Sequence, residues 1–239
     1  MAHRRHVLSA VTALAAAALL AAGSPAESTP PKQSPIDVVL SAIRPSPSAP
    51  ALAISYGHSP VDLSYASKDS DCAHRHEEET EVAQVAAGAG HVTFDGVRYE
   101  LAQFHFHTPS EHTFEGVHTP LEMHLVHRSA AGEYLVIGVP LVVGAPSTAD
   151  TVLAQLAPEC GPSQHLDDVD LDSLLPPNRA TLRYTGSLTT SPFDEGVRWF
   201  LMAPRQVTAG AVARFQHLFT DGNSRPTQPL NGRTVEWHR

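Results

Sequence analysis

The alternation of apolar and polar residues along the middle of the chain predicts a protein made mainly of β-strands. Asp95-Gly96 lies between two short β-forming runs, and such a pair is typical of a tight hairpin turn. The continuous apolar run over 134–143 has the character of a strand buried on both faces. Strands are therefore expected at residues 92–94, 97–101, 102–107, 121–127, 134–143, 180–188 and 196–202.

Helical patterns are scarce in comparison. Residues 148–157 form one candidate helix, and residues 208–219 form a better one, because Thr208 can cap its start and several apolar residues share a face. No charge run or internal repeat divides the chain. The pattern therefore favours a single, mostly β domain over residues 33–239, with a large twisted sheet and a few short peripheral helices.

The amino-terminal segment has the order of a secretory signal peptide. Arg4 and Arg5 precede an apolar run over 7–22, and small residues that suit cleavage follow it. The run is short for a membrane span, which needs roughly 20 residues. We therefore predict a signal peptide over residues 1–26, with an uncleaved anchor as the alternative. The mature protein would then be periplasmic or extracellular and free of the membrane.

Composition narrows the classes of function. The chain has 239 residues and a net charge of −9, which argues against nucleic-acid binding, because that requires clustered Lys and Arg. Its two cysteines, Cys72 and Cys160, cannot build a four-cysteine zinc site. In an exported protein they could pair with each other or remain two separate thiols. The 15 histidines, nearly as many as the 16 Lys and Arg together, point to metal or proton chemistry.

Two histidines lie two residues apart in the predicted strand over 102–107. Because strand side chains alternate, His105 and His107 point to the same face, together with Gln103. Phe104 and Phe106, which alternate with these three residues, face the opposite side of the strand. At this spacing the two imidazoles are about 6.5–7 Å apart at the backbone, so both can reach one ion.

The predicted strand over 121–127 offers a third imidazole. Glu122, His124 and Val126 share one of its faces. If the two strands are neighbours, three neutral imidazoles with an open position describe a catalytic zinc site rather than a structural one. Gln103 and Glu122 could each accept a ring N–H from a ligand histidine and so fix its tautomer.

Several separated motifs connect these histidines to a known family. They are QSPID (33–37), QFHFHTPSEHT (103–113), LEMHLVH (121–127), YTGSLTTSP (184–192), VRWF (197–200) and RPTQPLNGR (225–233). In this text and order the chain resembles the alpha-class carbonic anhydrases, especially the secreted bacterial ones. The resemblance implies a central, twisted, mostly antiparallel ten-stranded sheet, with zinc at the bottom of a conical cleft.

The resemblance also implies a metal site with one Zn²⁺ per chain. The ligands would be His105, His107 and His124. Gln103 and Glu122 match the family's hydrogen-bond partners of two of these rings. For the remaining ring, the resemblance implies a backbone carbonyl near Asn231 and Gly232.

The implied activity is the reversible hydration of CO2 to bicarbonate and a proton, by attack of zinc-bound hydroxide. Thr189 matches the residue that accepts a hydrogen bond from the hydroxide, and Glu111 matches the acceptor of the threonine proton. This pair would orient the hydroxide toward CO2. The implied lining of the CO2 and bicarbonate site is Val126, Val136, Leu188, Thr190, Val197 and Trp199.

The sequence departs from the family in three places. The family's usual amino-terminal aromatic segment before QSP is missing, and with it a tyrosine of the active-site water network. Secreted members often join a cysteine before QSP to one after TTxP; both are missing here, and Phe193 stands at the second position. The family's Asn-x-Gly-His text, which carries the proton-shuttling histidine, is missing too. His74 and His76 are the nearest substitutes, with His76 marginally preferred. A solvated turn or an accessory metal-binding pair is the alternative for these two histidines.

Two other functions remain open at this point. One is a non-catalytic binding module with a carbonic anhydrase-like fold, and the other is an exported zinc-binding protein that uses its histidine-rich surface. Zinc stoichiometry separates the enzyme from the zinc-binding protein, since the enzyme needs one ion and a buffer takes several. The sequence is compatible with a monomer or a homodimer.

Overall fold

The computed structural model describes residues 30–69, 72 and 78–239. Residues 31–239 form one compact unit. The predicted signal peptide over residues 1–26 lies outside the described residues. Within the described ranges, no helix combines the length and the apolar character needed to cross a bilayer.

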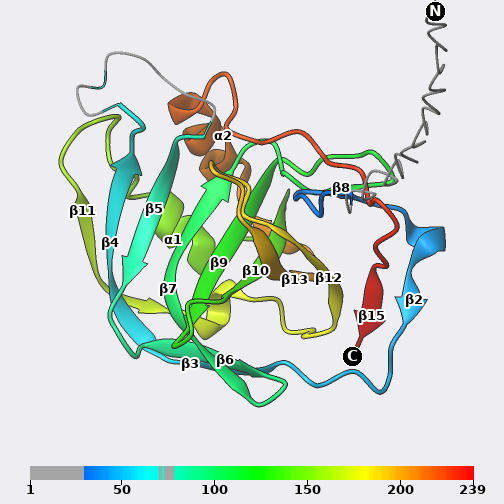
Figure 1. The fold of residues 1–239 in the computed structure, drawn as a ribbon. Coiled ribbons are helices and arrows are strands. Elements are labelled where there is room, and N and C mark those ends of the chain that lie inside the picture. Colours follow the sequence, from blue (N-terminus) through cyan, green and yellow to red (C-terminus); the bar gives the residue numbers. More distant parts are fainter. Residues whose placement is uncertain (1–29, 70–71, 73–77) are drawn as a thin grey trace, which may run out of the picture. The chain divides into compact units, whose positions relative to one another are not determined.

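Strands make up most of the regular structure (Figure 1). The first half of the chain contains β1 (Asp37–Val38), η1 (Leu40–Ala42), β2 (Arg44–Pro45), β3 (Ala53–Tyr56), β4 (His58–Ala66), β5 (Thr80–Val85), β6 (Gly90–Phe94), β7 (Val97–His107) and β8 (Thr113–Phe114). The second half contains β9 (Leu121–Ser129), β10 (Tyr134–Val143), α1 (Thr148–Leu153), β11 (Gln164–Asp170), η2 (Asp172–Leu174), β12 (Thr181–Ser187), β13 (Glu195–Met202), β14 (Arg205–Val207), α2 (Ala209–Leu218) and β15 (Glu236–His238).

One large sheet contains 13 strands within the described part of the chain. Its main path runs β11-β4-β5-β7-β9-β10-β13-β12-β15-β2, and β3, β6 and β14 attach beside it. Most neighbours are antiparallel, but β10 pairs parallel with both β13 and β14, and β15 with β2. The predicted fold class is thus confirmed: the main path has the implied ten strands, and the sheet as a whole is mixed.

The predicted hairpin and central strands are confirmed. Asp95 and Gly96 both have positive φ, at 50° and 75°, as a two-residue hairpin turn requires, and they connect β6 to β7. The runs predicted separately at 97–101 and 102–107 form one strand, β7. Its pairing with β9 shifts between Leu101 and Gln103, so the strand contains a bulge just before the histidine pair.

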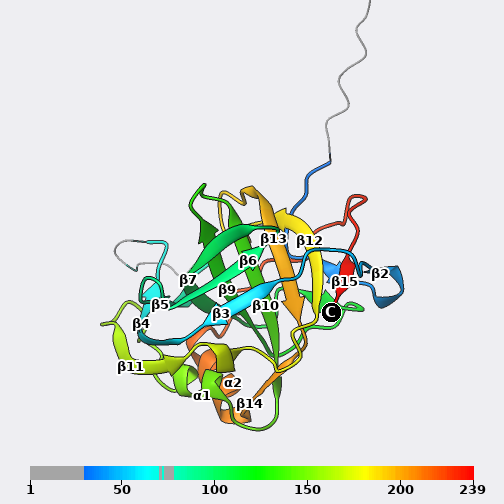
Figure 2. The same ribbon diagram turned by 90° about the horizontal axis from the view of Figure 1, so that it is seen from below.

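Two apolar clusters lie on the two faces of the sheet. The larger one lies under the helices, where Phe106 of β7 contacts Phe215 of α2 with ring centroids 5.9 Å apart. Figure 2 shows α1, α2 and β14 gathered at one side of the sheet. The smaller cluster includes Val136, Tyr184 and Trp199. Burial of both faces explains why β10 is almost continuously apolar, and β9 is mostly buried too although it carries Glu122, His124 and His127.

Local hydrogen bonds set the helix ends. The Thr208 hydroxyl accepts from the Ala211 amide, so Thr208 is the N-cap of α2 as predicted. α1 is shorter than expected and ends at Leu153 instead of residue 157. A capping box between Ser147 and Asp150 fixes its start, and Asp150 also accepts from the Thr208 amide at 2.9 Å, which joins the two helices.

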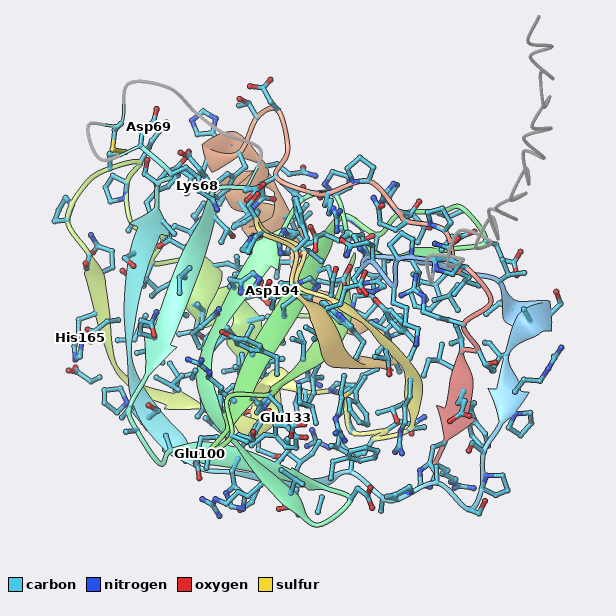
Figure 3. The ribbon with its side chains drawn as sticks, in the orientation of Figure 1. Lys68, Asp69, Glu100, Glu133, His165 and Asp194 are labelled. Carbon is cyan, nitrogen blue, oxygen red and sulfur yellow. A yellow bond between two sulfur atoms is a disulfide. The ribbon has the colours of Figure 1, made fainter. Side chains whose placement is uncertain are left out.

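A disulfide joins Cys72 to Cys160 across 88 residues, with their Cα atoms 6.2 Å apart. It ties the chain after β4 to the loop that precedes β11. Figure 3 shows the bridge beside Asp69, at the same end of the sheet as Lys68, whereas Glu100 and Glu133 lie at the opposite end.

Candidate active site

Three histidines from two neighbouring strands converge on one face of the sheet. β7 and β9 pair antiparallel, with His105 directly opposite His124, and His107 follows two residues later on the same face. The ring centroids of His105, His107 and His124 lie 4.6–5.3 Å apart. One nitrogen from each ring lies within 4.8 Å of the others, a spacing at which the three could hold one metal ion.

Hydrogen bonds to the other ring nitrogens orient two of these imidazoles. His105 Nδ1 donates to Gln103 Oε1 at 2.9 Å, and His107 Nδ1 donates to the Asn223 carbonyl at 2.9 Å. Both acceptors fix the ring with its proton on Nδ1 and leave Nε2 with its lone pair free. His107 Nε2 is buried and has no hydrogen-bond partner within the described ranges, which suits an atom that coordinates a metal ion.

The carbonyl on His107 corrects one expectation. It belongs to Asn223, not to the segment near Asn231 and Gly232. The loop after α2 brings it there, because the Asn223 amide donates to the Thr108 carbonyl at 2.9 Å, at the end of β7. The Asn223 side chain is also buried, and it is fixed by the backbone of Glu79, Phe106 and Thr108.

The third imidazole is oriented by a buried carboxylate. Glu122 Oε1 accepts from His124 Nε2 at 2.9 Å and from His112 Nδ1 at 2.8 Å, while Oε2 accepts from the His112 amide. This leaves His124 Nδ1 on the side of the other two ligand candidates. His112 Nε2 in turn lies 2.7 Å from the Tyr184 hydroxyl, which is 2.8 Å from Ser34 Oγ. Sequence reasoning did not single out Tyr184 or Ser34.

Burial and charge set the protonation of this group. Burial is the main effect that lowers the pKa values of His105, His107 and His124, so these rings are neutral, which is the form that binds a metal. Burial alone would raise the pKa of Glu122, but its contacts with His112 and His124 hold it well below the usual range. Three neutral imidazoles beside an ionised carboxylate form a donor set that suits Zn²⁺.

A pocket of about 390 Å³ opens above His105 and His124. One side of it is apolar, and the other carries hydroxyl and charged groups. Its lining comprises Ala66, Ser67, Lys68, Glu78, Thr80, Val82, Gln103, His105, His124, Val126, Tyr134, Val136, Leu188, Thr189, Thr190 and Trp199. Five of the six expected substrate-site residues are in this set. Val197 is the exception, and it is buried in the apolar cluster that also contains Trp199.

Glu111 lies beside the histidines, fully buried, at the start of the segment between β7 and β9. Its Oε1 accepts from the Arg225 amide at 2.9 Å. Burial raises the pKa of Glu111 to about 7, against the lowering effects of His124, the Arg225 amide and the Thr189 hydroxyl. A divalent cation on the three rings would favour the ionised carboxylate.

A stacked pair fixes the loop that carries Thr189. The Arg225 guanidinium lies 3.8 Å from the centroid of the Phe193 ring. Arg225 Nη1 donates to Gln33 Oε1 at 3.0 Å and to the Ser34 carbonyl at 2.6 Å. These contacts join the two segments that a disulfide was expected to join in secreted members of the family, although neither cysteine is present here.

His74 and His76 lie outside the described residues, so their role stays a prediction. Lys68 and Glu78, which precede and follow these residues in the sequence, form an ion pair of 2.9 Å and line the pocket. Glu78 also accepts from the Ser191 amide at 2.8 Å, next to the loop that carries Thr189.

Three histidines that could hold one metal ion, beside a partly apolar pocket in a mostly antiparallel sheet, define a class of metal-binding β-proteins. The family model for eukaryotic-type carbonic anhydrase matches residues 23–239. The chain belongs to this family.

Relatives and solved structures of the same family are similar to this chain. A carbonic anhydrase of Klebsiella pneumoniae is 42% identical over 147 residues, which cover 60% of each chain. One from Pectobacterium atrosepticum is 33% identical over 77% of this chain and 75% of its own length. The alpha-carbonic anhydrase of Thermovibrio ammonificans superposes with a TM-score of 0.75 at 36% identity, covering 86% of both chains. The matches to the Klebsiella and Nostoc relatives span only 60% and 53% of those proteins.

Proposed function

We propose that this protein is a zinc enzyme that catalyses the reversible hydration of CO2 to bicarbonate and a proton, with one Zn²⁺ per chain. The observation that carries the proposal is the convergence of His105, His107 and His124: one nitrogen of each ring lies within 4.8 Å of the others, and the other nitrogen is held by a hydrogen bond. A zinc ion held by three neutral imidazoles supplies water activated for attack at neutral pH.

The protein groups around the metal would orient the attack. An ionised Glu111 takes the hydrogen bond of the Thr189 hydroxyl, so that Thr189 can only accept from the attacking water. The water then directs a lone pair into the pocket. Thr189 is nearly buried, which keeps bulk water from competing for its hydroxyl.

The apolar side of the pocket would hold CO2 beside the attacking water. Val126 and Val136 are opposite each other on β9 and β10, and Val136 is in turn opposite Trp199 on β13. Leu188 completes the wall. CO2 has no net dipole and gains from such a surface, whereas bicarbonate is charged and does not. Thr190 provides a hydroxyl at the same pocket for the product.

The proton released in each turnover must leave the pocket. We propose His76, or His74, for this transfer because imidazole is the side chain whose ordinary pKa lies closest to neutral pH. Replacing both with Ala should slow turnover at low buffer concentration, and added imidazole should restore it. Unchanged rates at low buffer would assign the transfer to other groups.

The sequence is also the basis for proposals on export and oligomeric state. We propose that the amino-terminal segment directs export to the periplasm or the exterior, and that the mature protein acts as a monomer or homodimer. Protein sequencing of the exported chain would identify the cleavage site, and light scattering would give the oligomeric state.

The decisive experiment measures CO2 hydration by stopped flow, with protein loaded with zinc and with protein stripped by a chelator. The matched variants are His107→Ala, which removes a ligand, and His165→Ala, which removes an exposed histidine of β11. Hydration should require zinc at one ion per chain, be lost in His107→Ala and persist in His165→Ala. A folded protein that holds one zinc ion without hydrating CO2 would be a binding module, and several ions per chain would indicate a zinc-binding protein.

A further inference from the structure

Gly138 lies in the middle of β10, between the strand that carries His124 and the strand that carries Leu201. It pairs with His124 on one side and with Leu201 on the other. A glycine weakens the interior of a strand, because it loses more conformational freedom than other residues and has no side chain to pack. Its φ is not positive, so the backbone conformation gives no reason for glycine at this position.

Space gives the reason. A Cβ at Gly138 would lie 2.9 Å from Glu122 Oε1 and 2.8 Å from Leu201 Cδ2, both closer than real Cβ atoms approach other groups. Trp199 closes the third side at 3.7 Å. The missing side chain therefore opens the volume that the Glu122 carboxylate occupies.

Glu122 cannot move aside without consequence. It is fully buried, and the atom nearest Gly138, Oε1, is the one that accepts from both His124 Nε2 and His112 Nδ1. Any displacement of Oε1 changes both contacts at once. Leu201 is also buried, so it has little free volume into which it could retreat.

The other end of the same hydrogen-bonded series has a similar arrangement. A Cβ at Gly186 would meet Ser34 Oγ directly and would lie 2.8 Å from Cε2 of Tyr184. The hydrogen-bonded series from Glu122 through His112 and Tyr184 to Ser34 thus has a glycine at each end, where a side chain would collide with the terminal residue of the series.

We propose that Gly138 is a positioning residue of the metal centre. By leaving room for Glu122 Oε1, it fixes the proton of His124 on Nε2 and turns Nδ1 toward the metal. The inference rests on the proposed function only in naming the metal as zinc. The placement of the Glu122 carboxylate and of the two rings does not depend on the metal.

The test compares Gly138→Ala with Gly90→Ala. Gly90 is a matched control, because it is also buried in a strand and its Cβ would lie 2.8 Å from the Tyr56 ring, with only Tyr56 and Leu101, and no metal ligand, among its nearest neighbours. Both variants should lose stability. Zinc affinity, measured by competition with a chelator, should weaken about 10- to 100-fold in Gly138→Ala, as for other changes to groups that hold a ligand histidine, and should be unchanged in Gly90→Ala.

A spectroscopic measurement on zinc-free protein separates positioning from stability. The ¹⁵N shifts of the His124 and His112 rings report which nitrogen carries the proton, and they should change in Gly138→Ala only. This readout needs no zinc, so it tests the inference even if the wild-type protein fails to bind zinc or to hydrate CO2. Unchanged ring shifts together with wild-type zinc affinity in Gly138→Ala would overturn the proposal.

Two second-site changes keep the test decisive if Gly138→Ala folds poorly. Leu201→Val removes a methylene from the other neighbour of the new methyl group, and the double variant is then compared with Leu201→Val alone. Glu122→Asp retracts the carboxylate, so it should reduce zinc affinity less in the Gly138→Ala background than in the wild type. Additive effects of Gly138→Ala and Glu122→Asp would refute the contact.

Discussion

Acidification should destabilise this protein in part through His127, which faces the core side of β9, away from the metal ligands. Its ring is fully buried. Nδ1 donates to the Leu135 carbonyl at 3.1 Å, and Nε2 lies 2.5 Å from the Tyr56 hydroxyl, from which it accepts. Burial lowers the pKa of His127 to about 4. The folded protein therefore holds this imidazole in its neutral form.

The sign and size follow from the two pKa values. In the unfolded chain His127 takes up a proton below its ordinary pKa of about 6.5, whereas in the folded protein it does so only near 4. Stability from this group is therefore complete above pH 6.5, falls as the pH drops toward 4, and is constant below that. A difference of roughly 2.5 pKa units at about 1.4 kcal/mol each gives a total loss of about 3.5 kcal/mol, of which about 3 kcal/mol is reached by pH 4.

The assay is chemical denaturation of the wild type and of His127→Gln between pH 7 and pH 4. All other titratable groups are the same in both proteins. The difference between the free energies of unfolding of the wild type and of His127→Gln therefore isolates the contribution of His127. Glutamine retains a donor for Leu135 and an acceptor for Tyr56, but it does not titrate. The difference should change by about 3 kcal/mol over this range. Parallel stability curves, or an NMR titration of the His127 ring with a pKa near 6.5, would refute the reasoning.

Three further predictions test the contacts around the pocket. Replacing Cys72 and Cys160 with Ser should lower the free energy of unfolding by up to about 4 kcal/mol, since the bridge constrains a long loop of the unfolded chain. A double variant with the denaturation midpoint of the oxidised wild type would contradict this. Phe193→Leu removes the ring stacked on Arg225 and should cost about 1 kcal/mol in thermal or chemical unfolding, and a wild-type midpoint would show that the stack contributes nothing. Asn223→Ala leaves buried backbone groups without partners and should cost about 2–3 kcal/mol while weakening zinc binding through His107; full zinc affinity in a destabilised protein would separate the two effects and reject the second.

The candidate ligands were predictable because they depend on local geometry. Alternation along a strand places His105 and His107 on one face, and it places their neighbour Gln103 there as well. The same rule put Glu122 beside His124. Only the pairing of β7 with β9 was not local, and the two strands lie close enough in sequence for antiparallel neighbours to be the natural expectation.

The remaining contacts could not be predicted in this way, because they join residues that are far apart in the sequence. The carbonyl that holds His107 comes from Asn223, 116 residues away. A motif can show that some carbonyl is needed, but the loop after α2 decides which one reaches the ring. Val197 was placed in the pocket wall by resemblance; in the structure it is buried in the same apolar cluster as Trp199 and is not among the residues that line the pocket.

Gly138 differs from these residues because the sequence contained a signal that was not used. A glycine within an otherwise apolar, β-forming run has no benefit for the strand itself, so something outside the strand must account for it. Periodicity puts Gly138 on the face of Val136, but it does not identify the group that needs the space. Only the pairing of β10 with β9 shows that this group is the Glu122 carboxylate, in contact with two rings at once. An interior strand glycine therefore indicates that some group approaches the backbone closely at that position, and the structure is needed to name the group.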